Sequence, residues 1–290
     1  MQEPSFDAAI EALAPWLGRK RIVDDEIAPS TVRRICGMLD QDLDRFAPGD
    51  PLPGHWFAMF FAESTRQSDI GPDGHPEKGV LLPPIPLPRR MGAGRRVNLQ
   101  GCLRVGVPAR QTVEVAAITP KQARTGQIAI LTMRHTVESE GRTIAVDEFD
   151  AIYREAPKPG AASPRTEPRQ APEGAVWRDS HRLSNALVFR YSALTWNAHR
   201  IHYDSDYARD EEGYPALVQN GGLTMLLMAE AARKRMPVDP ASFSVRLTHP
   251  LYVGEILHLC GSPIEAGETT CWAVNDAGVL CGEMRFTLPD

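Results

Sequence analysis

The sequence has no long apolar run. None of its apolar stretches approaches the roughly 20 residues that a helix needs to span a bilayer. The first residues, Met1 to Phe6, lack a basic segment followed by an apolar one, so we expect no secretory signal. Hydrophobic residues make up 42% of the chain and charged residues 24%, which is typical of a globular protein. These features predict a cytoplasmic protein with no membrane partner.

The sequence has few cysteines, and their spacing follows no known motif. The five cysteines are odd in number and no two have a C-x-x-C spacing, which argues against a disulfide framework and against a tetrahedral zinc site. Three of them lie in apolar segments, where we expect buried, reduced thiols: Cys260, Cys271 and Cys281.

A basic excess is absent as well. The formal net charge is −5 and the sequence pI is about 5.9, so we expect no nucleic-acid partner. Local basic pairs do occur, and we interpret each as a solvated face in preference to a site for a phosphate-bearing cofactor: Arg33-Arg34, Arg89-Arg90 and Arg95-Arg96.

A proline-rich segment divides the chain. Residues 156–174, APKPGAASPRTEPRQAPEG, contain five prolines and no Val, Leu, Ile or aromatic residue, so the segment has little apolar surface to bury. We therefore predict an N-terminal domain of residues 1–155, a linker of residues 156–174 and a C-terminal domain of residues 175–290. Both domains have an ordinary size.

The two parts share an order of elements. In the first we expect helices near 6–17 and from Ser30-Thr31 onward, then strands at 96–103, 111–118, 128–139 and 143–153. In the second we expect a strand near 180–183, helices at 184–196 and 222–235, then strands at 243–247, 255–260, 270–274 and 280–288. An apolar helix followed by consecutive strands predicts α+β units, each an antiparallel sheet wrapped around a helix.

Imidazole and amide side chains are dense in residues 191–204, YSALTWNAHRIHYD. The segment places Asn197, His199 and His202 in a short loop after a helix. Because imidazoles titrate near neutral pH, these residues suit general acid–base catalysis. A structural role, such as bonding a backbone group, is assigned to His199 more readily than to His202.

A metal site is the less favoured interpretation of this segment. His199 and His202 are three residues apart, and Asp204 and Asp206 follow them. There is no HExxH pair, however, and Arg200 between the imidazoles disfavours a bound cation. We therefore expect no metal.

The same segment resembles the hydratase motif of the MaoC-like, double-hotdog family of acyl-CoA hydratases and dehydratases. The family motif is a small residue, Gly, Asp, any residue, Asn, Pro, an aliphatic residue and His. On this resemblance Asn197 takes the place of the catalytic Asp, and His202 that of the catalytic His. Trp196 stands at the Gly, His199 at the Asn and Arg200 at the Pro. The change to Asn197 matters, because an amide does not accept a proton as a carboxylate does.

The resemblance covers nearly the whole chain. It implies a double hotdog with a degenerate N-terminal unit and an active C-terminal unit. Residues 84–94, PIPLPRRMGAG, resemble the segment that leads into the N-terminal sheet of such proteins. Asn220-Gly221-Gly222 stands where the family commonly has His-Gly-Pro before the C-terminal helix. Within the family, the sequence most resembles hydratases of mesaconyl-C4-CoA (3-methylfumaryl-CoA) or itaconyl-CoA.

The resemblance implies a hydro-lyase that reversibly hydrates an enoyl-CoA thioester to a hydroxyacyl-CoA. His202 is then the general base and acid, and Asn197 holds the water. The backbone N–H of Gly221 or Gly222, at the positive end of the helix dipole, stabilises the thioester oxygen. Coenzyme A is part of the substrate, and no cofactor is expected.

Further residues are candidates for substrate binding. His199 lies in the catalytic loop, and Arg90 and Arg200 are candidates for the free carboxylate of a C4-dicarboxylic substrate or for the phosphates of coenzyme A.

Two other functions stay open. A hotdog acyl-CoA thioesterase would place a carboxylate on or near the central helix, and Glu230 stands in a suitable position there. A non-catalytic acyl-CoA binding subunit is the other alternative, because Asn197 replaces the catalytic carboxylate of the family. A fused pair of hotdogs is compatible with a monomer or with a homodimer.

Overall fold

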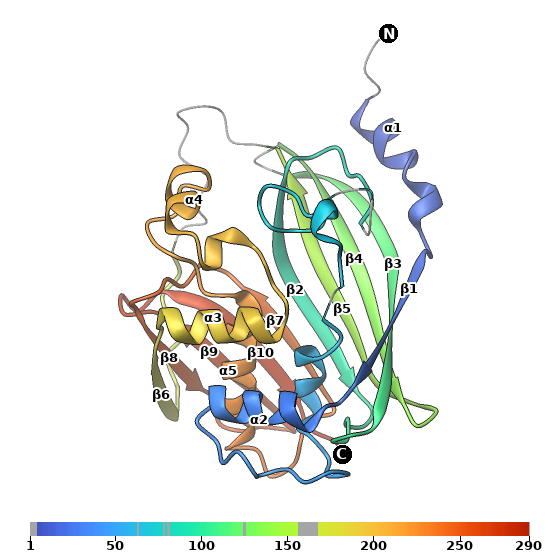
Figure 1. Ribbon diagram of the computed structural model, residues 1–290. Helices are drawn as coiled ribbons and strands as arrows, with labels where there is room; N and C mark the ends of the chain where they lie inside the picture. The colour runs from blue at the N-terminus through green and yellow to red at the C-terminus, as the bar shows by residue number, and fades with distance from the viewer. Residues whose placement is uncertain are drawn as a thin grey trace.

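The computed structural model describes residues 5–62, 64–77, 79, 82–123, 126–155 and 168–289. These residues form a ten-stranded antiparallel sheet with helices packed against one of its faces (Figure 1). The strands are β1 (Lys20–Glu26), β2 (Arg89–Leu99), β3 (Pro108–Ala123), β4 (Gly126–Ser139), β5 (Arg142–Arg154), β6 (Trp177–Arg182), β7 (Ser242–Leu247), β8 (Ile256–Gly261), β9 (Glu268–Val274) and β10 (Leu280–Thr287).

The strand order reveals two equivalent halves. The order of strands across the sheet is β1-β3-β4-β5-β2-β7-β10-β9-β8-β6. In each half, the first strand of that half forms the outer edge, the third, fourth and fifth follow it, and the second lies at the centre of the sheet. The halves meet where β2 pairs with β7, from Arg95 opposite Val245 to Asn98 opposite Ser242. Two units are therefore joined edge to edge into one sheet, which confirms the α+β double-hotdog fold.

The helices lie on the concave side of this sheet, some directly against its strands and others against further helices. They are α1 (Phe6–Glu11), η1 (Ala14–Trp16), α2 (Pro29–Met38), η2 (Gly54–Met59), η3 (Gln67–Asp69), α3 (Asn185–Leu194), η4 (Arg200–His202), α4 (Ser205–Asp210) and α5 (Gly221–Arg233). The apolar helix α5 is the central helix of the second unit, and nine of its residues are buried. Its counterpart in the first unit is η2, a 3-10 helix of six residues. The first unit thus keeps the sheet but has a much shorter helix within it.

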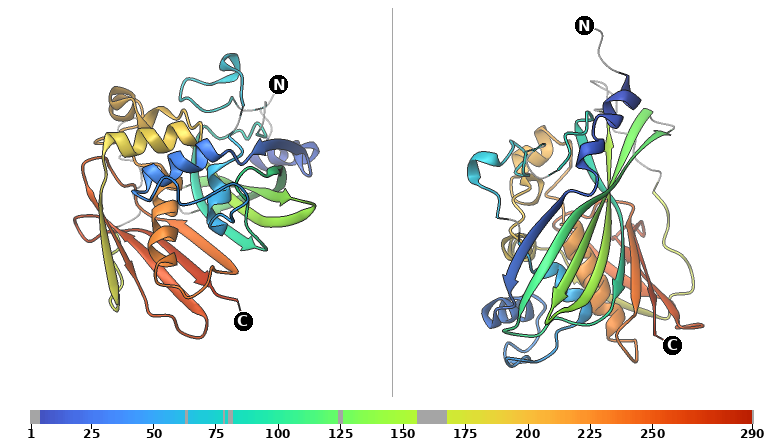
Figure 2. Two further views of the ribbon diagram at one scale, coloured as in Figure 1. Left: turned by 60° about the horizontal axis from the view of Figure 1, so that its bottom comes forward. Right: turned by 90° about the vertical axis from the view of Figure 1, so that its right-hand side faces the viewer.

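The packing of the helices also joins the units. Helices α2 and α3, which follow the first strand of each unit, lie side by side over α5 (Figure 2). One hydrophobic cluster holds residues of both units, among them Trp56 of η2 and Met228 of α5. None of the helices in the described ranges is long and apolar enough to cross a membrane.

Local sequence explains most of these elements. Glu140 and Gly141 both adopt positive φ, at 51° and 71°, as the tight turn between β4 and β5 requires. Strand β2 begins at Arg89, earlier than the expected 96, and a bulge between Gly92 and Gly94 accommodates the glycine-rich part. Strand β1 was not expected from its sequence.

The predicted linker is described only in part, because residues 156–167 lie outside the described ranges. Near its end, Gln170 forms an isolated bridge with Val279, and the N–H of Ala171 donates to the carbonyl of Gly278 at 3.1 Å. The chain thus reaches the second unit along its last hairpin. The domain boundaries at 155 and 174 stay a prediction.

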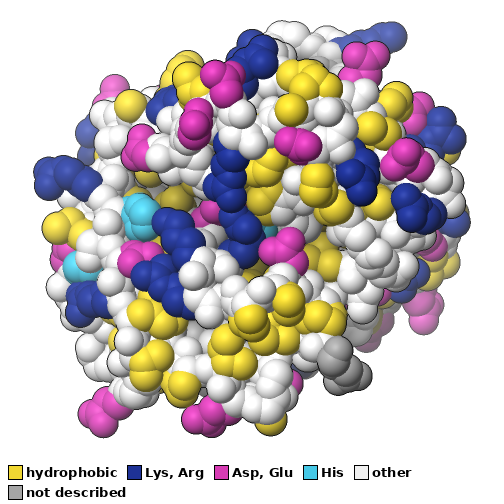
Figure 3. Space-filling view, turned by 90° about the horizontal axis from the view of Figure 1, so that it is seen from below, with side chains coloured by type: hydrophobic (Ala, Val, Ile, Leu, Met, Phe, Trp, Pro, Cys, Tyr) yellow, Lys and Arg dark blue, Asp and Glu magenta, His cyan; other side chains and the backbone are white. Residues whose placement is uncertain are grey.

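The surface and the thiols agree with the composition. Basic and acidic side chains are interspersed around apolar patches on the face seen in Figure 3, as the small net charge suggests. All five cysteines are free. Cys271 and Cys281 are buried, as expected, whereas Cys260 is half-buried.

Candidate active site

The loop with the candidate catalytic residues begins where α3 ends. Trp196 has a left-handed backbone with φ of 54°, and its indole is exposed. This is the position at which the family motif has glycine, and a left-handed turn explains that preference. The next residue, Asn197, closes the turn, because its Oδ1 accepts the N–H of His199 at 3.0 Å.

His202 is buried at the end of this loop, in η4. Its Nδ1 lies 2.7 Å from the carbonyl oxygen of Val218, and a carbonyl accepts a hydrogen bond only from a ring nitrogen that carries a proton. The proton therefore resides on Nδ1, and Nε2 keeps its lone pair. Burial lowers the pKa of His202 to about 4, so the imidazole is neutral near pH 7.

His199 forms the centre of a row of three imidazoles. Its ring centroid lies 4.1 Å from that of His75 and 5.4 Å from that of His202. Burial, and then the neighbouring imidazoles, lower the pKa of His199 to about 3. His199 therefore contributes no positive charge at neutral pH. It forms the wall of the site that faces the first unit.

The first unit contributes a loop, residues 71–77, that covers the histidine loop. The N–H of Arg200 donates to the carbonyl of Asp73 at 2.9 Å. Gly74 has a φ of +88° and lies so close to the carbonyl of Ala198 that a Cβ there would overlap it. The Gly- and Pro-rich sequence of residues 71–88 predicts a loop but not its place at the site, because only the folded chain brings it to residues more than a hundred positions later.

Asp73 holds His75 within that loop. The Asp73 carboxylate accepts the backbone N–H of His75 at 2.9 Å and lies 3.1 Å from its Nδ1. Burial alone would raise the pKa of Asp73, but the hydrogen bonds and charge of His75 outweigh it and lower the pKa to about 2. Asp73 is therefore ionised, and it orients the imidazole that stacks on His199.

The carboxylates considered as metal ligands from sequence have other partners. Asp204 caps α4 by accepting the N–H of Tyr207 at 3.0 Å and pairs with Arg200. Asp206 pairs with Arg209. Instead, ligand atoms of Asp73, His75 and His199 lie within 4.8 Å of one another. The Asp73–His75 hydrogen bonds already account for this cluster.

The two arginines proposed from sequence differ in their surroundings. Arg200 donates from Nε and Nη2 to Asp204 at 3.1 and 2.8 Å, and from Nη1 to the carbonyl of Pro72 at 3.0 Å. Its guanidinium thus connects the two loops. Arg90 is exposed on β2, and its charge adds to the lowering of the pKa of His199 after burial and the neighbouring imidazoles.

The N-terminus of α5 lies beside the histidine loop. Val218, which accepts from His202, is followed within four residues by the helix start at Gly221-Gly222. The first N–H groups of a helix have no partner within it, so the backbone amides of Gly221 and Gly222 are available to an oxygen atom. A Cβ at Gly222 would overlap the hydroxyl of Tyr191, so glycine permits this close approach.

A small cavity of about 30 Å³ begins at this helix start. Its wall combines the two units, with Tyr191 and Gly222 from the second unit and Arg95 from the first. The remaining lining residues are mostly apolar and include Phe57, Met59, Met225, Leu226, Phe243 and Met284. The interpretation of Arg95 as part of a solvated pair was therefore wrong: Arg95 turns toward the core side of β2, and only Arg96 faces outward.

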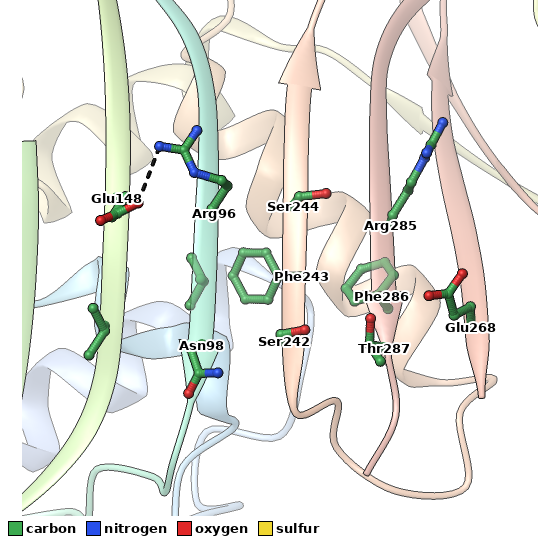
Figure 4. Close-up of a pocket in the computed structure, with 12 residues that line it drawn as sticks. Arg96, Asn98, Glu148, Ser242, Phe243, Ser244, Glu268, Arg285, Phe286 and Thr287 are labelled. Atoms are coloured by element: carbon green, nitrogen blue, oxygen red, sulfur yellow. Dashed lines mark hydrogen bonds and ion pairs between the residues drawn. The ribbon is translucent and has the colours of Figure 1, made fainter. Parts of the chain in front are cut away.

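A second hollow lies on the opposite face of the sheet. It is a shallow groove of about 410 Å³ across the β2–β7 junction (Figure 4). Arg96, Ser244 and Arg285 are among the side chains that line it, and Arg96 pairs there with Glu148 and Asp150. The histidine loop and the N-terminus of α5 are not part of its lining.

Glu230, the carboxylate considered for a thioesterase, is buried and fully engaged. Its Oε1 accepts from Trp56 Nε1 and lies 2.8 Å from His55 Nε2, and its Oε2 accepts from Gln41 at 2.9 Å. Burial alone would raise the pKa of Glu230, but the hydrogen bond and charge of His55 outweigh it and lower the pKa to about 2. The hydrogen bonds of this carboxylate therefore link α5 to the first unit.

The two joined units and the histidine loop beside a helix N-terminus define a double-hotdog protein of the MaoC-like class. The family model for hydroxyacyl-thioester dehydratase type 2 matches residues 54–253. A mesaconyl-C(4)-CoA hydratase from Chloroflexus aurantiacus is 38% identical over 239 residues, which cover 82% of this chain and 84% of that protein. The chain therefore belongs to the hydroxyacyl-thioester dehydratase type 2 family, and it is a hydro-lyase.

More distant relatives agree. The mitochondrial hydroxyacyl-thioester dehydratase type 2 of Schizosaccharomyces pombe is 27% identical over 237 residues, covering 72% of this chain and 76% of that protein. A MaoC-like dehydratase from Phytophthora capsici superposes with a TM-score of 0.71 at 13% identity, covering 95% and 96% of the two chains. A Mycobacterium tuberculosis protein described as a double hotdog has a TM-score of 0.61 at 14% identity, with 96% of each chain covered. At these identities the two structures show the fold alone.

Proposed function

We propose that the protein reversibly adds water to the double bond of a short enoyl-CoA, and that its substrate is a C4-dicarboxylic thioester of the mesaconyl-C4-CoA type. The observation that carries the proposal is the buried His202, whose Nδ1 is bonded to Val218 beside the open N-terminus of α5. A base and a group that stabilises an oxyanion thus adjoin one another, as water addition to a thioester requires.

In the proposed reaction His202 moves the proton. Nε2 takes a proton from water as the water oxygen bonds to Cβ, and electrons of the double bond shift toward the thioester oxygen. The backbone N–H groups of Gly221 and Gly222 stabilise that oxygen, aided by the positive end of the α5 dipole. The imidazolium then returns the proton to Cα, so H and OH have been added and the enzyme is unchanged.

Asn197 would position the water. Its Oδ1 is occupied by the N–H of His199, and Nδ2 has no hydrogen-bond partner within the described ranges. A free amide N–H can donate to the water oxygen, which leaves the water protons for His202. In this scheme a single imidazole serves both proton steps, and no carboxylate is needed as a second base.

The size of the cavity and the Chloroflexus relative support a short dicarboxylic acyl group. A volume of about 30 Å³ has room for a group of a few atoms, such as a carboxylate, and not for a long chain, and the methionines in its wall are flexible enough to adapt. We further propose that one chain forms the catalytic unit, because the β2–β7 pairing already joins two hotdogs within it. Sedimentation of the active enzyme tests that point.

The decisive experiment follows the loss of the conjugated thioester absorbance with a panel of enoyl-CoA substrates, and it measures free CoA thiol in parallel. We expect hydration without thiol release. His202→Ala should lose about 10²–10⁴-fold in rate, the range for removal of a general acid–base group, and His199→Ala should lose far less. His258→Ala, a change far from the loop on β8, is the control.

Near-normal turnover by His202→Ala would contradict the site assignment. Release of thiol without hydration would indicate the thioesterase alternative. Absence of any turnover across the panel would indicate a non-catalytic acyl-CoA binding subunit.

A further inference from the structure

We infer that Arg95 and Tyr191 form a subsite for the free carboxylate of a dicarboxylic acyl group, an assignment that rests on the hydratase function proposed above. The subsite is the cavity between the two units, next to the N-terminus of α5. Its ligand class is a short acyl-CoA with a carboxylate on or near Cβ.

The placement of Arg95 follows from the alternation of side chains along β2. Arg96 points to the outer face, where its half-exposed side chain pairs with Glu148 and Asp150. Arg95 points the other way and lines the cavity, and its side chain is 21% exposed. A guanidinium on the core side of a sheet is costly unless it is paired, so its partners decide its role.

Arg95 has one ionic partner and several unused donors. Its Nε lies 3.1 Å from Oδ1 of Asp147, which is 2% exposed, and its guanidinium lies 5.6 Å from the centre of the Phe149 ring. Within the part of the chain that the structure describes, neither Nη has a hydrogen-bond partner. Arginine carries five N–H donors, and its free fork matches a carboxylate.

The charges around this subsite allow another anion. Asp147 balances Arg95, and His135, 3.8 Å from Asp147, adds no charge near neutral pH because burial lowers its pKa. Glu230 lies 2.8 Å from Nε2 of His55, which lines the same cavity, and its carboxylate is held by His55 and Arg233. An incoming carboxylate would therefore meet the Nη groups of Arg95 and not an uncompensated acid.

Tyr191 supplies a neutral donor in the same cavity. Its hydroxyl lies against Gly222 and has no hydrogen-bond partner among the described residues. Burial raises the pKa of Tyr191 to about 12, so the hydroxyl keeps its proton and can donate it to a carboxylate. Because Gly222 also offers its N–H to the thioester oxygen, the subsite is adjacent to the reacting carbons.

This arrangement fits a carboxylate attached directly to Cβ. In mesaconyl-C4-CoA the carboxylate is bonded to Cβ, trans to the thioester, and crotonyl-CoA has an uncharged methyl group in that same position. A long alkyl chain in the same position would leave the guanidinium and the hydroxyl buried without partners, which is unfavourable. The cavity therefore selects for the carboxylate and against a fatty acyl chain.

The test compares these two substrates with the purified full-length chain. The variants are Arg95→Met and Tyr191→Phe, and the control is Arg96→Met, which removes a neighbouring guanidinium from the outer face. We expect Arg95→Met to lower kcat/KM for mesaconyl-C4-CoA about 100-fold, as loss of a buried charged partner does, while crotonyl-CoA hydration changes less than about threefold. Tyr191→Phe should lower the mesaconyl-C4-CoA value about tenfold, and Arg96→Met should change neither.

Because Arg95→Met leaves Asp147 buried without its partner, the double variant Arg95→Met/Asp147→Asn repeats the comparison with the charge removed, and thermal unfolding of each variant reports on the fold. An equal loss for both substrates in a folded variant overturns the inference, and so does unchanged mesaconyl-C4-CoA hydration. If the wild type hydrates crotonyl-CoA but not mesaconyl-C4-CoA, the subsite is refuted while the hydratase activity stands. If the wild type hydrates no enoyl-CoA at all, the proposed function fails, and the subsite with it.

Discussion

The imidazole of His202 and the carbonyl of Val218 are 2.7 Å apart, and this contact joins the histidine loop to the segment that starts α5. It fixes the tautomer of His202, because the carbonyl requires a proton on Nδ1. It also fixes the ring relative to the helix start, so the imidazole and the amides of Gly221 and Gly222 keep one geometry.

The low pKa of His202 predicts an unusual pH dependence of activity. A base must be neutral to accept a proton, and this imidazole stays neutral down to its pKa of about 4. We therefore expect kcat/KM for hydration to stay level from pH 8 to about 5 and to fall only below that. A pH–rate profile of the wild type measures it, and an acid limb near 6.5, the value of an unperturbed histidine, would contradict this account.

Stability should depend on pH over a related range. Both His199 and His202 have a lowered pKa in the folded chain, about 3 and about 4, whereas the unfolded chain titrates near 6.5. Between those values the unfolded state binds more protons, so the free energy of unfolding decreases as pH falls, by up to about 1.4 kcal/mol per unit for each histidine. Urea unfolding at several pH values measures the slope. The double variant His199→Ala/His202→Ala should lose the part of the slope that these two histidines contribute between pH 6.5 and 4, while His135, His181 and His258, whose pKa values burial also lowers, keep their own contribution. An unchanged slope would refute the assignment.

Sequence patterns predicted nine of the ten strands and the helices α2, α3 and α5, because apolar periodicity and turn residues encode them locally. Strand β1, KRIVDDE, was missed because it is an edge strand with few apolar residues, and no residue of it is fully buried. The motif likewise points to Asn197 and His202, which lie within six positions of each other, and their catalytic roles stay a prediction.

The rest of the site depends on contacts across the chain. The loop with Asp73 and His75 reaches the histidines only after the two units join, and no local signal marks that approach. Arg95 and Arg96 are adjacent in sequence, and only the register of β2 decides which of them faces the cavity. Which side chains meet at the site is therefore decided by the tertiary structure and not by the local sequence.

Asn197 offers a direct test of how the water is held. Asn197→Ala should lower the hydration rate strongly, because it removes both the donor to the water and the acceptor for His199. Asn197→Asp keeps that acceptor but removes the amide donor, so we expect it to lose activity as well, although it restores the commoner family residue. Steady-state kinetics of both variants measure this, and an Asp variant as active as the wild type would show that the amide acts only through its oxygen.

Gly74 tests whether the loop of the first unit matters. Gly74→Ala would introduce a methyl group where the carbonyl of Ala198 lies, so the loop that carries His75 must shift. We expect a loss of about 10–100-fold in kcat/KM, because small displacements of site residues are costly. Gly79→Ala is the matched control: Gly79 has a similar φ of +86° but no atom within 4 Å of a Cβ. Equal effects of the two changes would attribute the loss to backbone strain alone.

Substitution of Glu230 distinguishes a structural role of this carboxylate from a catalytic one. Three side chains, those of Gln41, His55 and Trp56, surround its carboxylate, so Glu230→Gln removes a buried charge and forces at least one donor to lose its acceptor. We expect a loss of about 3 kcal/mol in the free energy of unfolding, as for breaking other buried ionic contacts, because α5 is no longer fastened to the first unit. Chemical unfolding measures the loss, and hydration assayed at low temperature, where the variant is folded, should keep most of its rate. A catalytic carboxylate would behave in the opposite way: the variant would stay as stable as the wild type and lose its turnover.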